Sequence, residues 1–555
     1  MTGGSDVGGG REKTGGGQAS GSGASRGGAV LSLEEIRRQV EARVEEEAAL
    51  PGGGGGDDEG GADSDFIQEC IRHNEMGDGE LFKLLHRGRF VFNKAMKTWL
   101  KWSGHHWEID HLDEASGAVE AVVEAYQAEV DRITVALREI DAKDIRKSKE
   151  ALRETITKRI WALRGDRRDK CLKWAHTSMN PLAIFGDELD ARPWFLACPN
   201  CVVDLKTGNE RPGRPDDYLM KATSAEWRGL FEPCDVWVRT LLEIFDWDES
   251  LVDFLQRLPG YALIGAVYEA IFPTLIGPGG RNGKSTIMET VKSVLGPLAG
   301  PIPNEMLMAS YKVSGGGNSP TPEIMALRGL RLAWASEPED GARVSAGKVK
   351  WLTGKDTLVG RYPHDKHNIT FEPSHTLILL SNFRPHADTN DAAFWERLIS
   401  IPFKLRFIRN REPRADNERA ADIGLDEKLR AEASGILAWM VRGCLAWQRK
   451  GLAPPPKVVE ETQDYFASED NMGAFVDYCC DTGEEGEFEC RAKELYDLFC
   501  AWWKQYVGNF PPKQRKLGTY LKERFRSEKV GGVYRYYGIQ PNPEIIEEIM
   551  PDRKG

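Results

Sequence analysis

The sequence predicts a multidomain α/β protein, and three observations favour that fold class. The chain has 555 residues, enough for three or four domains of ordinary size. A short apolar strand, a glycine-rich loop and an amphipathic helix follow one another over 272–295. Further apolar strands follow before a proline-rich break at 454–456, and the remainder is predicted to form a small separate domain.

Composition and charge limit the classes of function. Hydrophobic residues make up 41% of the chain, which is enough for folded cores, and the formal net charge is -12. An acidic chain gives no general attraction to nucleic acid, so any DNA contact must come from local basic patches. Ten Cys in a chain of this length indicate reduced thiols rather than a disulfide framework. No apolar run approaches membrane-spanning length and no signal peptide is visible, so we expect a cytoplasmic protein without membrane contact.

The first 74 residues are predicted to be a disordered, glycine-rich tail with one short helix. Residues 1–61 hold 19 of the 58 Gly, a composition that cannot bury enough apolar surface to offset ordering entropy. Ser32 and Glu35 form a capping box ahead of an apolar helical face. That helix is either an isolated, partly formed helix or a docking helix for a partner.

Residues 75–235 indicate a mixed α/β N-terminal domain. A short helix and then strands are expected between 81 and 107. Residues 118–164 lack Gly and Pro and are densely charged, which predicts a long helix or a helical hairpin with one solvated side. Two short strands are expected in 194–208. Cys198 and Cys201 there form an isolated C-x-x-C pair with no further ligands at zinc-binding spacing. We therefore expect no metal ion to be bound by these two cysteines.

The glycine-rich loop runs from Gly277 to Thr286 and has the context of a phosphate-binding loop. A strand at 272–276 precedes it, and an amphipathic helix follows. Backbone N–H groups of such a loop converge on phosphate oxygens, Lys284 would reach the β- and γ-phosphates, and Ser285 would ligate Mg²⁺. Pro278 replaces the usual Gly, which allows a loop one residue longer than the standard one. The predicted cofactors are ATP and Mg²⁺, bound by Gly277, Gly279, Gly280, Asn282, Gly283, Lys284, Ser285 and Thr286.

Three further residues are candidates for catalysis. Glu337 ends an apolar strand and could polarise the attacking water and help to hold Mg²⁺, although Glu339 and Asp340 leave a shift of two residues open. Asn382 ends another apolar strand and suits a sensor of the γ-phosphate. Arg397 is expected on a short helix, where it could act across a subunit boundary as an arginine finger.

The order of these motifs resembles the superfamily 3 helicases, in the branch of poxvirus and phage or plasmid primase-helicases. Gly277 to Asn382 spans 106 residues, close to the compact spacing of that family. The segment 350–361 is similar to the family's third motif, except that Lys355 replaces a Gly. The resemblance covers roughly 75–541 and implies an AAA+-like core, a homo-hexameric ring and translocation on single-stranded DNA. The residues that carry the match are Asn282, Gly283, Lys284, Ser285, Glu337, Lys350, Leu352, Thr353, Gly354, Asp356, Arg361, Asn382 and Arg397.

Two surfaces are candidates for DNA contact. The predicted hairpin at 362–368 matches the position of the family's pore hairpin, and its Lys366 and His367 would contact backbone phosphates. The C-terminal domain is similar in element order to a winged helix, with helices expected at 488–504 and 513–526 and a wing strand at 533–537. Residues 512–537 contain eight Lys or Arg and two Glu, a local charge of +6. The candidate contacts there are Lys513, Arg515, Lys516, Lys522 and Arg524.

These interpretations give a domain plan and a function. The predicted function is an ATP-dependent DNA helicase for replication of a phage, plasmid or other mobile element in a bacterial host, with single-stranded DNA and origin duplex as ligands. Only about 75 residues precede the resemblance, so a separate primase or polymerase partner is expected. An ATPase-silent origin-binding or loader protein and a small-molecule kinase are the alternatives. The predicted parts are 1–74 tail, 75–235 N-terminal domain, 236–265 helical collar, 266–410 ATPase core, 411–456 helical segment and linker, 457–541 winged-helix-like domain and 542–555 tail.

Overall fold

The fold is described from a computed structural model of the chain. The structure describes residues 63–309, 321–336, 343–362, 368–389, 391–507, 509 and 511–551. The predicted helix at Ser32 lies outside these residues. Within them, no helix is long and apolar enough to cross a membrane.

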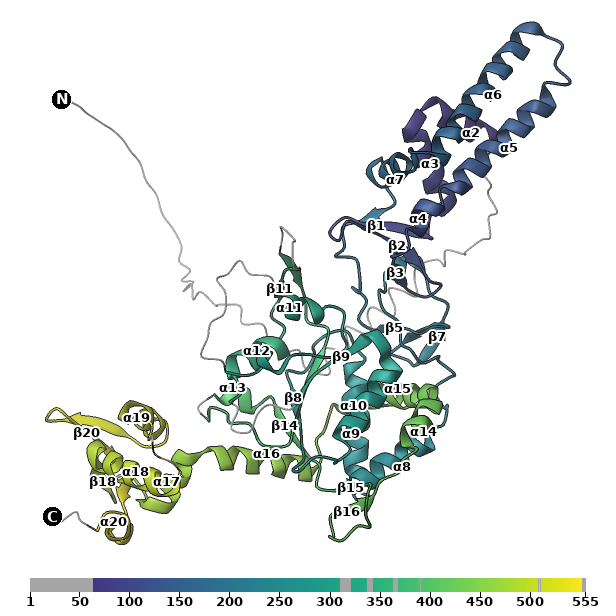
Figure 1. The fold of residues 1–555 in the computed structure, drawn as a ribbon. Helices are drawn as coiled ribbons and strands as arrows, with labels where there is room; N and C mark the ends of the chain where they lie inside the picture. The colour runs from purple at the N-terminus through teal and green to yellow at the C-terminus, as the bar shows by residue number, and fades with distance from the viewer. Residues whose placement is uncertain are drawn as a thin grey trace, which may run out of the picture. The chain divides into compact units, whose positions relative to one another are not determined.

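The first part of the described chain is a helical cluster that packs beside a small mixed sheet (Figure 1). Of the two alternatives for 118–164, a long helix or a helical hairpin, the structure has the hairpin, because α5 and α6 pack against each other. The sheet has the strand order β3-β2-β1-β4, antiparallel except for β1 and β4. The elements are α2 Ser64–Arg72, α3 Asn74–His86, β1 Phe90–Asn93, β2 Thr98–Trp102, β3 Trp107–Ile109, α4 Glu114–Gly117, α5 Glu120–Ala136, α6 Lys143–Arg164, α7 Arg168–Thr177 and β4 Ala183–Ile184.

The predicted end of the disordered tail at residue 74 is wrong. Helix α2 begins at Ser64, where the Asp63 side chain caps it by accepting from the Phe66 N–H. Ile67, Cys70 and Ile71 are spaced for one helical face and are buried in the same apolar cluster as α5 and α6. The segment is short, follows the glycine-rich stretch directly and packs mainly on the next helix, α3, so composition averaged over the tail did not reveal it.

The segment after this helical cluster belongs to a second apolar core. The two strands predicted in 194–208 are confirmed as an antiparallel pair, and a third strand extends them. Cys198 and Cys201 are buried at their turn, and among the described residues no group of three or more His, Cys, Asp or Glu is placed to hold a metal ion. The elements are β5 Phe195–Ala197, β6 Val202–Asp204, β7 Asn209–Arg211, η1 Pro215–Asp217, α8 Asp235–Ile244 and α9 Glu249–Ala262.

The central sheet has five parallel strands in the order β14-β8-β13-β10-β9. Strands β8, β13 and β14 are buried along their whole length, as expected for a parallel sheet covered on both faces. The elements are β8 Phe272–Ile276, α10 Lys284–Leu295, η2 Gly296–Leu298, β9 Ala299–Pro301, η3 Asn304–Met306, α11 Pro322–Ala326, β10 Leu332–Ser336, α12 Ala346–Thr353, β11 Leu358–Gly360, β12 Ile369–Phe371, β13 Thr376–Ser381, α13 Ala392–Trp395 and β14 Leu398–Pro402.

The predicted collar and the helical segment predicted within 411–456 pack together, although the whole central sheet separates them in the sequence. Helices α9 and α15 cross at Gly260 and Gly443, where a Cβ on either residue would collide with the backbone of the other helix. Their core also includes side chains of β5, β6 and α10. The elements that complete this region are β15 Arg406–Ile408, β16 Glu418–Ala420, α14 Leu425–Ala431 and α15 Ala433–Lys450.

The C-terminal boundaries differ from the predicted ones. Helix α16 packs on β14, so the separate C-terminal core begins near Met472. Residues 489–491 form a strand rather than the start of a helix, and the second predicted helix covers only 514–522. The elements are α16 Pro456–Glu469, α17 Asn471–Cys479, β17 Cys480–Thr482, β18 Glu489–Arg491, α18 Ala492–Tyr506, α19 Gln514–Lys522, β19 Ser527–Val530, β20 Val533–Tyr537, β21 Ile539–Pro541 and α20 Pro543–Ile549.

The predicted tail over 542–555 is also wrong in its first half. Asn542 caps α20 by accepting from the N–H groups of Glu544 and Ile545, and Pro543 occupies the first turn. Ile549 is buried against the C-terminal core, where α20 packs on α18. This contact with an earlier element of the chain gives the short helix its stability.

The buried His375, which precedes β13, predicts a pH-dependent stability. Neither ring nitrogen forms a hydrogen bond of normal geometry, and burial lowers the pKa of His375 from 6.5 to about 4. As the pH falls below 6.5, the unfolded chain binds a proton that the folded chain rejects until about pH 4. The free energy of unfolding should therefore fall by about 3 kcal/mol over that interval.

We expect His375→Leu to remove most of this loss, as measured by urea unfolding at pH 7.0 and 4.5. The exposed His111 provides a matched control, and His111→Leu should retain the wild-type pH dependence. If the free energy of unfolding of His375→Leu depended on pH as in the wild type, the loss of stability in acid could not be assigned to His375.

Candidate nucleotide-binding site

The glycine-rich loop connects β8 to α10 and takes a backbone conformation that side chains disfavour. Gly279, Gly280 and Gly283 have φ angles of 73°, 69° and 90°, and Arg281 joins them with a φ of 57°. A Cβ at Gly283 would also collide with the side chain of Ile244 on α8. Glycine is therefore required where the loop enters the helix, and the N-terminal N–H groups of α10 face the loop's interior.

Lys284, the first residue of α10, is buried and points back across its own loop. Its Nζ donates to the Gly277 carbonyl over 2.8 Å and to Asn282 Oδ1 over 3.1 Å. A third hydrogen bond of 3.1 Å reaches Asn382 Oδ1. Asn382 follows β13, whose end pairs in parallel register with the end of β8. The structure therefore brings together two residues, far apart in the chain, that the sequence proposed for the same site.

Asn282 has a structural contact that its sequence position did not reveal. Its Nδ2 donates to the carbonyls of Leu405, over 2.9 Å, and Pro278, over 3.3 Å. Its Oδ1 accepts from Lys284, so all its side-chain groups are used inside the protein. Asn282 thus ties the loop to the segment after β14, and any contact with a nucleotide would come from its backbone.

A pocket of about 130 Å³ opens between the loop and the ends of β10 and β13. Ser285 and Thr286 line it, as does Ser336 at the end of β10. Glu337, Glu339 and Asp340 lie outside the described residues, so the metal and water-activating role of Glu337 stays a prediction. The pocket is lined by Gly280, Arg281, Asn282, Gly283, Lys284, Ser285, Thr286, Ser336, Leu380, Ser381 and Asn382.

Arg397 is not on the short helix where the sequence placed it. It lies between α13 and β14, and its Nη1 donates to the Ala393 carbonyl. Its backbone carbonyl accepts from the Phe272 N–H at the start of β8. Arg397 is therefore at the amino edge of the sheet, roughly 16 Å along a five-residue strand from the carboxyl edge that carries the loop. The chain does not bring Arg397 to its own Lys284.

The motif resembling the family's third one joins two short helices. Lys350 on α12 forms a 2.7 Å ion pair with Asp391, and Asp391 in turn caps α13 by accepting from the Phe394 N–H. This pair positions α13, the helix immediately before Arg397. The predicted hairpin is confirmed as the antiparallel pair β11 and β12. Its Lys366 and His367 lie outside the described residues, so their DNA contacts stay predictions.

The basic residues predicted for the C-terminal domain surround α19 and the β19–β20 hairpin. Lys513 and Arg515 are exposed, whereas Lys516 lies 3.5 Å from the Asp388 carboxylate. Lys522 Nζ lies 4.1 Å from the ring centroid of Tyr534, and the Arg524 guanidinium lies 3.7 Å from that of Tyr520. The cations and aromatic rings of this surface are therefore stacked on one another.

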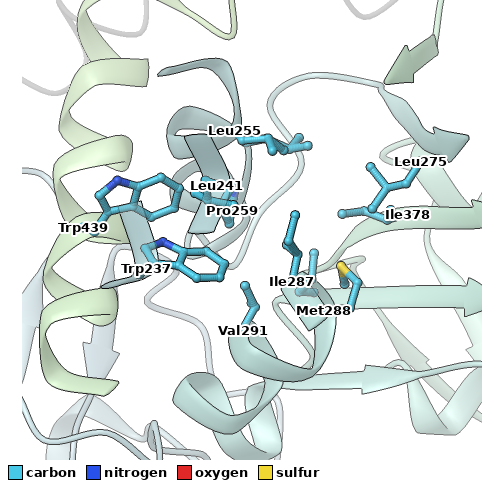
Figure 2. Close-up of a pocket in the computed structure, with 12 residues that line it drawn as sticks. Trp237, Leu241, Leu255, Pro259, Leu275, Ile287, Met288, Val291, Ile378 and Trp439 are labelled. Atoms are coloured by element: carbon cyan, nitrogen blue, oxygen red, sulfur yellow. The ribbon is translucent and has the colours of Figure 1, made fainter. Parts of the chain in front are cut away.

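A second, apolar cavity of about 30 Å³ lies behind α10 (Figure 2). Trp237 and Trp439 meet edge to face on one side, with ring centroids 5.6 Å apart. Ile287, Met288 and Val291 of α10 approach from the other side. A cavity this small with an almost wholly apolar lining cannot hold a nucleotide, so the polar pocket is the candidate site.

Filling this cavity should stabilise the protein. Val291→Ile adds one methylene group to a side chain that lines it, and we expect the free energy of unfolding to rise by about 0.5–1 kcal/mol. Val294 lies on the same helix, fully buried but outside the cavity. Val294→Ile should therefore overpack the core and destabilise it by about 1 kcal/mol. Urea unfolding measures the free energy of unfolding of both variants. Destabilisation by Val291→Ile would show that the cavity cannot accept an added methylene group.

Comparison with known proteins gives a family match for one segment of the chain. Residues 79–246 match the family model described as D5 N terminal like. A protein of Acanthamoeba polyphaga mimivirus, provisionally named helicase L207/L206, is 27% identical over 463 residues, which cover 80% of this chain and 47% of that protein. A provisionally named helicase of Frog virus 3, 022R, is 25% identical, covering 57% of this chain and 39% of that protein.

African swine fever virus has a further relative, C962R, provisionally named a primase. It is 21% identical, covering 58% of this chain and 34% of that protein. Among solved structures, the apo C-terminal region of NrS-1 aligns with a TM-score of 0.44 and 10% identity, covering 84% of this chain and 99% of that one.

These matches support a relation to D5-like viral proteins that are provisionally named helicases and primases. The chain spans about half or less of the length of these curated relatives. The relatives come from viruses named for amoebal, amphibian and swine hosts, so the expected bacterial host has no support.

Proposed function

We propose that this protein is an ATP-dependent DNA helicase of superfamily 3, which acts as a ring in the replication of a virus or other mobile element. The observation that carries the proposal is the hydrogen bond between Lys284 Nζ and Asn382 Oδ1 at the mouth of the pocket. A lysine that binds the β- and γ-phosphates and an amide that senses the γ-phosphate must converge in this way.

The residues around the pocket fit MgATP. The loop has a left-handed backbone that turns N–H groups inward, and α10 directs its positive end to the same place. Ser285 is exposed in the pocket, where its hydroxyl could ligate Mg²⁺. On binding, the phosphates would replace the Gly277 carbonyl and Asn382 as partners of the Lys284 ammonium, which is already oriented. Glu337, which directly follows Ser336 in the chain, would supply the carboxylate that activates water.

The position of Arg397 supports an assembly in which one copy completes the site of the next. Arg397 is at the opposite edge of the sheet from its own pocket, and its Nε is buried without a hydrogen-bond partner in the described part of the chain. In a head-to-tail ring, that edge would face the loop of a neighbouring copy. The guanidinium would then leave the Ala393 carbonyl for the γ-phosphate.

The C-terminal surface supports binding to DNA backbone. Lys513, Arg515, Lys522 and Arg524 are exposed around α19, and the order of α18, α19 and the β19–β20 hairpin suits a winged-helix-like domain. Phosphate contacts from these cations would weaken as salt rises. We further propose single-stranded DNA and origin duplex as ligands and a separate primase or polymerase as a partner.

Lys284→Ala tests the nucleotide site. We expect the wild-type protein to hydrolyse ATP faster with single-stranded DNA and the variant to lose at least about 100-fold in turnover, because a phosphate-binding cation is lost. Lys292→Ala is the matched control, since Lys292 lies on the same helix two turns away from the loop. Steady-state phosphate release measures all three proteins.

Hydrolysis that is equal in Lys284→Ala and wild type would refute the proposed site. Nucleotide binding without turnover, with or without DNA, would favour an ATPase-silent origin-binding or loader protein. Phosphate transfer to a small acceptor would indicate a kinase.

Mixing two inactive variants tests the role of Arg397 across subunits. Arg397→Ala and Lys284→Ala should each lose most activity alone. An equimolar mixture should recover part of it, because some interfaces then pair an intact Arg397 with an intact Lys284. Titration of one variant into a fixed amount of the other shows how the recovered rate of ATP hydrolysis depends on the ratio of the two. A mixture that stays at the sum of its separate activities would exclude the trans role.

A further inference from the structure

The hairpin of α5 and α6 is fixed at its base by a buried polar network. The Tyr126 hydroxyl of α5 donates to Asp78 of α3 over 2.8 Å, and the Arg159 guanidinium of α6 lies 3.4 Å from the same carboxylate. Asp78 is 1% exposed, and burial raises its pKa to about 6. Ile156 and Ile160 on the same side of α6 join the apolar core. These contacts set the rotation of α6 about its own axis.

That rotation places an indole in solvent. Trp161 is 75% exposed on the face of α6 opposite Ile156 and Leu163. Ile145 near the start of α6 is also 55% exposed. Most large aromatic side chains in the described part of the chain are buried or half-buried. The indole of Trp161 therefore offers a flat aromatic surface to a ligand from a helix whose rotation is fixed.

The same helix carries a concentrated positive charge. Helix α6 contains eight Lys or Arg and three Asp or Glu, a formal charge of +5, whereas α5 contains one Arg and four acidic residues, a charge of -3. Lys143 and Lys147 are exposed, and their side chains form no ion pair or hydrogen bond within the described part of the chain. Lys143, Lys147 and Trp161 lie within about 40° of one another around the helix axis, from the 100° turn per residue.

We infer that this face of α6, called here the α6 face and defined by Lys143, Lys147 and Trp161, binds single-stranded nucleic acid. The two lysines would contact backbone phosphates and the Trp161 indole would stack on a base. Lys158 lies on the same side but forms a 2.7 Å ion pair with Glu154, so it is not counted as a phosphate contact. The face extends roughly 27 Å from Lys143 to Trp161, at 1.5 Å per residue, long enough for several successive nucleotides. The loop end of the hairpin, where α6 begins, extends beyond α2 and α3 (Figure 1).

The chemistry favours nucleic acid over an acidic protein surface. An acidic protein would need only the cations, whereas an exposed indole in line with phosphate-binding lysines provides the flat surface on which a base stacks. The α6 face lies outside the nucleotide pocket and outside the C-terminal basic surface. Binding by it requires neither ATP nor hydrolysis, so the inference does not depend on the ATPase proposal.

The test measures binding of a fluorescein-labelled 30-nucleotide oligothymidylate to the full chain, without nucleotide, at several salt concentrations. Trp161→Ala should weaken binding roughly 5- to 100-fold with an unchanged salt slope. Trp161→Phe should retain most of the affinity. The pair Lys143→Glu and Lys147→Glu should flatten the slope of log K against log salt by about 1.4, or 0.7 for each phosphate contact. Glu at position 143 suits the first turn of a helix, so folding should persist.

The control pair Arg228→Glu and Arg239→Glu makes the same change in net charge at exposed sites outside the hairpin. It should leave the salt slope at the wild-type value. Equal affinity of the control pair, the lysine pair and Trp161→Ala would overturn the inference. Displacement of the oligonucleotide by polyglutamate at equal charge would also overturn it, in favour of an acidic protein partner. Unchanged ATP hydrolysis in the α6 variants would show that the nucleotide site is intact and separate.

Discussion

The position of β8 between β13 and β14 is the constraint on which the rest of the core depends. Because all five strands are parallel, everything that follows a strand meets at one edge of the sheet and everything that precedes a strand meets at the other. The glycine-rich loop and Asn382 share the first edge, and Arg397 is held at the second by its bond to Phe272. A single chain therefore carries both halves of the proposed hydrolysis site, separated by the length of the sheet.

The same sheet is tied to the upstream domain through one buried cation. Arg331, immediately before β10, is buried, and its guanidinium donates to the carbonyls of Pro193, Leu263 and Phe195. Burial lowers the pKa of Arg331 to about 10, so it stays charged at neutral pH. Breaking these hydrogen bonds would leave an uncompensated charge in the protein interior, which costs several kcal/mol. The start of β10 is therefore held rigidly in place. The strand that ends at the pocket is thereby held in place against the β5–β7 sheet and α9.

The sequence predicts best what depends on nearby residues. The strand 272–276, the loop and α10 follow from apolar spacing and glycine content over one short stretch of the chain, and the structure has them at those positions. Helix α20 was missed because it packs on α18, an earlier element of the chain, and α2 was missed because it is a short helix directly after the glycine-rich segment that packs mainly on its neighbour α3. The burial of the Asn282 side chain depends on the Leu405 carbonyl, which lies beyond β14, and no local pattern encodes that contact. Arg397 lies at the amino edge of the sheet because β14 pairs in parallel with β8. A short sequence motif does not reveal the order of the strands, so it could not predict this position.

The net charge of the whole chain does not reveal the charge of its individual elements. The chain is acidic at -12, yet α6 carries +5 beside an α5 of -3, and residues 512–537 carry +6. At physiological salt, charges more than about 8 Å apart are largely screened from one another. A phosphate near α6 therefore experiences the cations of that face far more than the acidic residues elsewhere. The proposed DNA contacts would therefore be restricted to α6 and to residues 512–537, while the acidic remainder of the chain would repel a polyanion.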